Sequence, residues 1–296
     1  MMPPDDPPKL RLVPPESPEE LAARYEREKR AQAYHREHLM EQSSLAPFRV
    51  GSVPYLNAVP LARGIEDELI FAVPSKLAEM LRKGELDAAL VSVTEVLFHD
   101  AYDVLDGIAV ASLGEVKSVF LAHRGPLEHI QEVHCDPASL TSVKLLEVLL
   151  AERGIRPQFQ PLENGTTGEL PDNFLLIGDR ALEYARSGPD REIFDLGTAW
   201  YEMTGLPFVY AVWALRRSVP NERLRRQLRE ARDFGLDTLD TIIRSRTEFD
   251  YELRKDYLGW HIHYHLGADE KRGLARFVEL LRKHGSGQVF DPRFVM

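Results

Sequence analysis

The chain has 296 residues, of which 44% are apolar and 9% aromatic, and its formal net charge is -10 at pH 7. This length and composition allow one large core or two modest ones, so we expect a globular protein. The acidic balance, without a block of Lys and Arg on one predicted face, argues against nucleic acid and anionic membrane as partners. The single cysteine, Cys135, cannot form an internal disulfide, and its setting in "EVHCD" favours a buried structural role over a nucleophile.

Residues 1–47 are predicted to form an N-terminal extension. The first residues are rich in proline and acids, unlike a secretory signal. The longest apolar run later in the chain is too short to cross a bilayer. We therefore expect a cytoplasmic protein. Ser17 as N-cap, Pro18 at the first helical position and Glu20 as capping-box partner predict a charged helix to about Gln42. Its sparse apolar positions place it on the surface or against a partner chain, which leaves a homodimer open.

From Phe48 onward, strand and helix signals alternate, which predicts a mainly parallel sheet covered by helices. "FRVGSV" is the first expected strand. Ser75 is expected to cap a helix that Gly84 ends, and "LDAALVSV" is the next strand. "EVHCD", "SLTSVKLLEVLLAERG" and "NFLLIGD" repeat this pattern as a second α/β unit.

Two apolar segments, "SVFLAHRG" and "LPFVYAVWALRR", suit chain crossings between two lobes, and the sequence from Asn221 is mostly helical. We therefore predict an α/β protein with a ligand cleft between its lobes. Residues 48–115 and 210–296 are assigned to lobe 1, and residues 116–209 to lobe 2.

A set of motifs from about Arg49 to Phe277 resembles the chorismate dehydratase family of the futalosine route to menaquinone. The resemblance depends on the order and spacing of the whole set: "VPYLNAVPL", "KLAEMLRKGELDAALVSVTE", "SVFL", "DPASLTSVKLLEVLL", "LLIGDRAL", "FDLGTAWYEMTGLPFVYAVWALRR" and "HYHLGADEKRGLARF". It implies a two-lobed fold like that of type II periplasmic binding proteins, and it does not extend to residues 1–47.

The resemblance also implies an activity: a hydro-lyase that converts chorismate into 3-[(1-carboxyvinyl)oxy]benzoate and water in menaquinone biosynthesis, without a cofactor. Two alternatives stay open, a non-catalytic solute-binding protein for a small carboxylate and a related menaquinone-pathway lyase. The "PYLN" stretch resembles the dehydratase branch better than the second alternative. The sequence has no GxSxG, GxxxxGK[ST] or GxGxxG motif, so phosphoryl transfer and nicotinamide chemistry lose support.

Asn57 and Ser118 are the residues that the resemblance implies to be catalytic. Asn57 follows the first strand, where its amide can donate and accept hydrogen bonds, although a helix cap there is an alternative. Ser118 aligns with a serine that the family keeps at the cleft, where its hydroxyl can bind a carboxylate or the leaving oxygen. Lys117 replaces a small residue of the family, and it adds a cation to the site or points to solvent.

Five further residues are predicted to bind substrate. Ser139, Thr141 and Ser142 open a predicted helix, where hydroxyls, free N–H groups and the positive end of the helix dipole form an anion site. Ordinary capping is the alternative, and it needs only one hydroxyl. Tyr55 and Ser92 lie near the ends of predicted strands, where a core ring and a scaffold residue are the alternatives.

We predict no metal site. In "WHIHYHLGADE", His261 and His265 share a face if the segment is helical, and His263 joins them only in a strand. The resemblance identifies this segment as a scaffold helix, and no Cys or acidic group at ligand spacing supports metal binding.

No base stands beside Asn57 and Ser118 in the sequence. We therefore hypothesise that the enolpyruvyl carboxylate of the substrate takes the ring proton itself. Asp179 and Glu95 are the alternatives as a base, and Asp179 is more simply explained as a helix cap.

Overall fold

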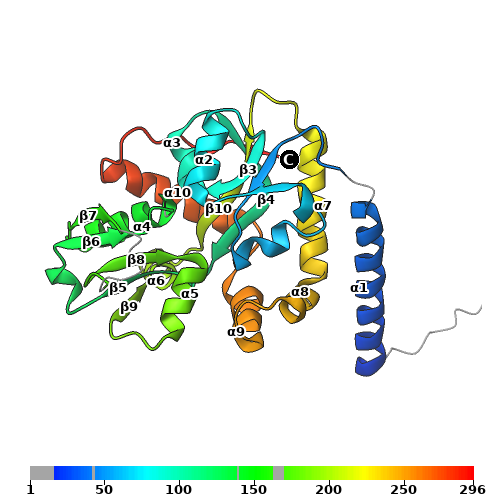
Figure 1. The fold of residues 1–296 in the computed structure, drawn as a ribbon, viewed down its shortest axis with the longest axis horizontal. Coiled ribbons are helices and arrows are strands. Elements are labelled where there is room, and N and C mark those ends of the chain that lie inside the picture. The colour runs from blue at the N-terminus through cyan, green and yellow to red at the C-terminus, as the bar shows by residue number, and fades with distance from the viewer. Residues whose placement is uncertain (1–16, 42–43, 139, 163–169) are drawn as a thin grey trace, which may run out of the picture.

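The computed structural model describes residues 17–41, 44–138, 140–162 and 170–296, which form two β-sheets with helices packed around them (Figure 1). The six-stranded sheet has the order β11-β4-β10-β3-β1-β2. Its strands are β1 (Val50–Ser52), β2 (Leu69–Phe71), β3 (Ala88–Ser92), β4 (Tyr102–Ser112), β10 (Phe208–Arg216) and β11 (Phe294–Val295). Strand β1 is parallel to β2 and β3, whereas β10 is antiparallel to both β3 and β4.

The five-stranded sheet has the order β7-β6-β8-β5-β9, with β6 parallel to β7 and β8 and β5 antiparallel to β8 and β9. Its strands are β5 (Val119–His123), β6 (Glu132–Cys135), β7 (Gln158–Pro161), β8 (Phe174–Ile177) and β9 (Glu192–Asp195). The predicted lobe boundaries, 48–115 with 210–296 and 116–209, stay a prediction.

Helices cover both sheets and lead away from the ends of several strands. The α-helices are α1 (Pro18–Glu41), α2 (Pro74–Arg82), α3 (Val93–Phe98), α4 (Leu140–Glu152), α5 (Gly178–Arg186), α6 (Leu196–Thr204), α7 (Glu222–Asp237), α8 (Leu239–Ser245), α9 (Tyr251–Asp256) and α10 (Ala268–Lys283). Shorter turns are the 3-10 helices η1 (Leu56–Leu61), η2 (Glu66–Glu68) and η3 (Leu127–His129), and the π-helical turn η4 (Tyr257–His261). Within the described part of the chain, no helix has the length and apolar character to cross a membrane.

Helix α2 begins one residue before the predicted cap. Val73 is the N-cap residue and Pro74 occupies the first turn, so the prediction of Ser75 as cap is wrong. The reason is that proline fits the first helical position, where its missing N–H costs nothing. Gly84 follows the end of the helix with φ +73°, as the sequence indicated.

Three buried aromatic rings fix the place where the chain returns from the five-stranded to the six-stranded sheet. Trp200 in α6 packs against Phe208 in β10, with ring centroids 5.1 Å apart, and both rings contact Phe277 in α10. The Trp200 indole N–H also donates to the carbonyl of Pro207, at 3.1 Å. This cluster sets the start of β10, and so the position of Tyr210 two residues later.

Helix α1 lies beside α7 and apart from the two sheets (Figure 1). Arg36 pairs with Asp233 and Asp237 of α7, and Met40 is the buried residue at its C-terminal end. Most other side chains of α1 are exposed, as expected for a polar surface helix. The homodimer stays a prediction.

Candidate functional site

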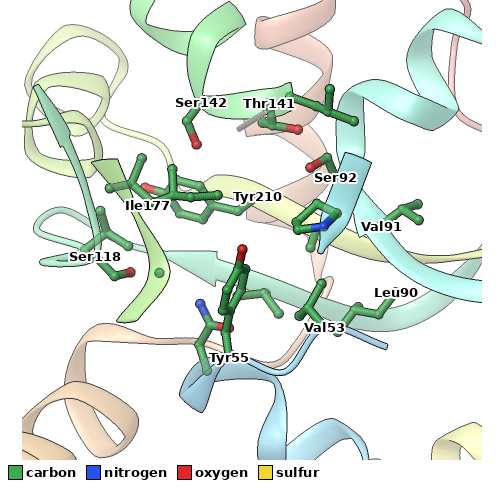
Figure 2. A pocket seen from close by; sticks show the side chains of 18 of the residues that line it. Val53, Tyr55, Leu90, Val91, Ser92, Ser118, Thr141, Ser142, Ile177 and Tyr210 are labelled. Atoms are coloured by element: carbon green, nitrogen blue, oxygen red, sulfur yellow. The ribbon is translucent and has the colours of Figure 1, made fainter. Parts of the chain in front are cut away.

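A pocket lies between the two sheets (Figure 2). The six-stranded sheet lines it with residues in β3, β4 and β10 and after β1, and the five-stranded sheet contributes residues around β5 and β8 together with the start of α4. The pocket holds about 610 Å³ of empty space, part of it open to solvent. A cleft of this kind, at strand ends and between two sheets, is a usual place for a small ligand.

The structure brings six of the seven predicted site residues into this one pocket. They lie at the end of β3, in the connections after β1 and before β5, and in the first turn of α4, and they are Tyr55, Asn57, Ser92, Ser118, Thr141 and Ser142. Ser139 lies outside the described residues. The catalytic and binding roles of all seven stay predictions.

A buried tyrosine that the sequence did not indicate joins the two predicted catalytic residues. The phenol of Tyr257 donates to Oγ of Ser118 at 2.7 Å, and Nδ2 of Asn57 donates to the phenol oxygen at 3.2 Å. Burial raises the pKa of Tyr257 well above its ordinary value, so this group stays a neutral donor. Because Ser118 Oγ accepts this bond, its own proton can be donated into the pocket.

The turn that presents Ser118 is held by Asp195, the N-cap residue of α6. The carboxylate accepts the N–H groups of Val116, Lys117 and Thr198 at 2.8 to 3.2 Å. Burial raises the pKa of Asp195, and these N–H groups oppose that rise. Lys117 adopts the left-handed conformation with φ 63°, so a specific backbone turn precedes Ser118.

The side chain of Lys117 does not line the pocket. Its ammonium group pairs with the carboxylate of Asp256 in α9, and this bond holds the pKa of Asp256 below its ordinary value. Lys117, where the family commonly has a small residue, therefore forms an ion pair that connects the turn before β5 to α9.

Helix α4 brings two hydroxyls to the opposite wall. Figure 2 shows the hydroxyl of Ser142 pointing from α4 into the pocket. Thr141 Oγ1 accepts the N–H of Thr94 at 3.2 Å and lies 3.1 Å from the Thr94 hydroxyl, which joins α4 to α3 across the pocket wall. Both hydroxyls stand at the positive end of α4, where an anion is stabilised.

Two further phenols belong to the site. Tyr55 points its phenol oxygen toward the middle of the pocket in Figure 2, and its ring packs on Gly178, where a Cβ atom would lie 3.2 Å from the ring. Burial, and then the charges of Asp136 and Asp179, raise the pKa of Tyr55 to about 12. Tyr210, which sequence reasoning missed, also lines the pocket, and its hydroxyl bonds to Ser112 Oγ at 3.1 Å.

The described lining residues include no Lys, Arg, His, Asp or Glu. The pocket therefore offers neutral hydroxyls, an amide and backbone N–H groups rather than charged partners. Neither alternative base is among those residues. Asp179 accepts the N–H of Leu56 at 3.2 Å, and Glu95 is buried against Arg82 at 2.6 Å. Asp179 is also not the helix cap that the sequence suggested, because Ile177 occupies the N-cap position of α5.

Comparison with known proteins decides the family. The model of the menaquinone biosynthesis family matches residues 48–283. The chain belongs to this family. A chorismate dehydratase of Thermus thermophilus is 37% identical over 276 residues, which cover 84% of this chain and 99% of that protein. A chorismate dehydratase of Campylobacter jejuni is 28% identical, over 76% of this chain and 89% of that protein.

The menaquinone biosynthesis family member also matches solved structures. A Candida albicans protein described as having the generic periplasmic binding protein fold aligns with a TM-score of 0.58 at 14% identity, over 83% of this chain and 92% of that one. At this identity the match shows the fold alone. The predicted family and the predicted α/β periplasmic-binding-protein-like fold are confirmed.

Proposed function

We propose that this protein is a chorismate dehydratase, a hydro-lyase of menaquinone biosynthesis that forms 3-[(1-carboxyvinyl)oxy]benzoate from chorismate. The observation that carries the proposal is 37% identity to the Thermus thermophilus enzyme across 99% of that enzyme. The match to periplasmic binding proteins leaves a solute-binding function as the alternative, but fold alone does not determine function. A cytoplasmic location stays a prediction.

The chemistry of the reaction fits a pocket of neutral donors. Chorismate is a dianion, and the elimination removes the ring proton next to the ether oxygen and expels the neighbouring hydroxyl. The C–H electrons complete the aromatic ring, and the hydroxyl leaves with a proton as water. Since aromatisation supplies driving force, the protein has to hold the dianion and orient the groups that react.

We assign the two walls of the pocket to different parts of the substrate. Thr141 and Ser142, at the positive end of α4, are proposed to bind one carboxylate. Asn57 and Ser118, which Tyr257 holds in place, are proposed to hold the enolpyruvyl carboxylate close to the ring proton. This carboxylate is the proposed base, and the absence of an ionisable carboxyl group among the described lining residues supports that role.

The test is to incubate the purified protein with chorismate and follow the product by mass spectrometry. A dehydratase forms an aromatic enol ether whose mass is lower than that of chorismate by one water. A solute-binding protein would leave chorismate unchanged while chorismate raised its melting temperature, because a ligand that binds only the folded state stabilises it. If chorismate were not converted and did not stabilise the protein, both functions would be contradicted.

A further inference from the structure

Residues 262–267 connect the π-helical turn to α10 as an extended segment, so the prediction of a scaffold helix is wrong here. The inward side chains are each at most 4% exposed: Ile262, Tyr264 and Leu266. His263 and His265 share the opposite face, and an isolated bridge pairs His263 with Ala111 of β4. The two imidazole rings stack, with centroids 5.5 Å apart and 19° between their planes.

Glu270, in the first turn of α10, brings a carboxylate to these imidazoles. Its Oε2 accepts the N–H of Gly267 at 2.9 Å, and its Oε1 lies 3.0 Å from Nε2 of His265. The possible ligand atoms of His263, His265 and Glu270 all lie within 4.8 Å of one another. The prediction that no acidic group supports metal binding is therefore wrong, because the turn at Gly267 folds Glu270 back onto the segment.

The burial of these side chains is unequal in a way that suits a bound ion. The side chain of Glu270 is 4% exposed, whereas that of His265 is 60% exposed. A carboxylate removed from water needs a positive partner. A divalent cation between the carboxylate and the two imidazoles meets this need. The exposed His265 ring gives the ion access and can rotate until the ligand atoms reach about 2.0–2.2 Å from the metal.

We propose that His263, His265 and Glu270 bind a divalent transition-metal ion, with zinc as the best match. Two imidazole nitrogens and one carboxylate oxygen are a known zinc ligand set, whereas magnesium and calcium prefer oxygen ligands alone. The site lies on the outer face of the segment whose Ile262 lines the pocket. The bound ion fixes this segment against α10 and takes no part in the pocket chemistry.

The test uses the full chain without a polyhistidine tag, stripped with EDTA and dialysed. Zinc chloride is titrated by calorimetry, and cobalt chloride by visible absorption. We expect one equivalent of either metal to bind and the melting temperature to rise with zinc. If the wild-type protein binds neither metal, the proposal is overturned.

Variants locate the ion. His265→Ala and Glu270→Gln should each weaken zinc binding at least about tenfold. Even the mutation of a residue that only contacts a metal ligand typically lowers metal affinity about 10–100-fold. Glu270→Gln keeps an oxygen that can accept the Gly267 N–H, and exposed His265 is not needed for folding, so both variants should stay folded by circular dichroism. His129→Ala, an exposed histidine in η3, is the control and should bind zinc like the wild type. Unchanged affinity in His265→Ala would overturn the site.

Discussion

Tyr257 donates a hydrogen bond of 2.7 Å to Oγ of Ser118, a residue 139 positions earlier in the chain. Asn57 donates to the same phenol oxygen at 3.2 Å. One fully buried side chain from η4 therefore orients the two groups that we propose to be catalytic, although Asn57 lies in η1 and Ser118 directly precedes β5 of the other sheet. Tyr257 is a positioning residue, and its removal should affect turnover through Asn57 and Ser118.

Tyr257→Phe keeps the ring and removes the hydroxyl. We expect kcat to fall about tenfold, because Ser118 loses the donor that directs its proton into the pocket and Asn57 loses its acceptor. KM should change less, since other hydroxyls hold the substrate. Steady-state kinetics with chorismate measures both constants.

Tyr264→Phe is the matched control for that variant. Tyr264 is also buried, but its hydroxyl has no hydrogen-bond partner among the described residues. Its loss should leave kcat unchanged and should not lower the melting temperature. An equal loss of turnover in both variants would show that a buried hydroxyl in general, rather than the bond to Ser118, is required.

Asn57→Ala and Ser118→Ala should lower kcat about 10²-fold or more, the scale for loss of a positioned donor in a water-excluded site. The affinity for chorismate should change less if these donors act mainly in the transition state. Calorimetry on the variants gives the affinity separately from the rate. A large loss of affinity with unchanged kcat would assign both residues to binding only.

A chorismate analogue with a neutral amide in place of the enolpyruvyl carboxylate tests the substrate as its own base. The analogue should bind more weakly and hardly react, because the proposed base is gone. Single-turnover rates at saturating enzyme compare it with chorismate. Comparable rates would exclude substrate assistance and require a base from the protein, with Asp179 and Glu95 as the first residues to replace.

The Arg49–Asp87 pair predicts a pH-dependent contribution to stability. Burial alone raises the pKa of Asp87, but the hydrogen bonds and charge of Arg49 outweigh it, and the net pKa lies below the ordinary 3.8. The pair therefore contributes stability above the unfolded pKa and loses it as the pH falls through the folded pKa. Arg49→Gln should lower the free energy of unfolding only slightly at pH 7, since the Arg49 side chain is half exposed and solvent screens the pair.

Urea denaturation of both proteins at pH 7 and at about pH 3 measures this difference. The difference in unfolding free energy between wild type and Arg49→Gln should narrow at the lower pH, because pH 3 lies below the ordinary pKa of an unfolded Asp, whose protonation favours the unfolded state. An equal difference at the two pH values would show that Arg49 acts through contacts that do not titrate, such as its 2.9 Å hydrogen bond to the carbonyl of Gly84.

Removal of α1 should cost stability and spare turnover. The deletion should end at residue 41, because Leu45 is buried in the core. Loss of the Arg36 ion pairs and of buried Met40 should lower the melting temperature by about 2–4 °C, the shift expected for roughly 1 kcal/mol, with kcat almost unchanged. Arg36→Ala in the full chain removes only the ion pairs, so it measures their contribution to the melting temperature apart from that of Met40. Lost turnover in a folded truncation would mean that α1 shapes the pocket.

The strands and their order along the chain could be predicted because the signals are local. Buried strands such as β3 and β10 are short apolar runs, and glycines such as Gly84 stand where helices end. Several residues around the pocket could be predicted from the sequence for a related reason. Tyr55, Asn57 and Ser92 follow or end strands, and strand ends are where α/β folds bind ligands.

The features that were not predicted depend on contacts between residues distant in sequence, or on a hydrophobic period of two that was misinterpreted as a helical one. Nothing near Tyr257 in the sequence marks its bond to Ser118, because the two residues meet only when the sheets pack together. The extended segment did have a local signal. Apolar residues alternate with His263 and His265 at a period of two, which is typical of a strand, yet the family resemblance favoured a helix.

The place of β10 in the six-stranded sheet has a consequence for synthesis on the ribosome. All strands of the five-stranded sheet come from residues 119–195, so that sheet can be complete while the other still lacks the strand between β3 and β4. Until β10 emerges, the facing edges of β3 and β4 remain unpaired, and such edges invite aggregation of nascent chains. The pocket, which needs Tyr210 from β10, is therefore among the last parts of the molecule to form during translation.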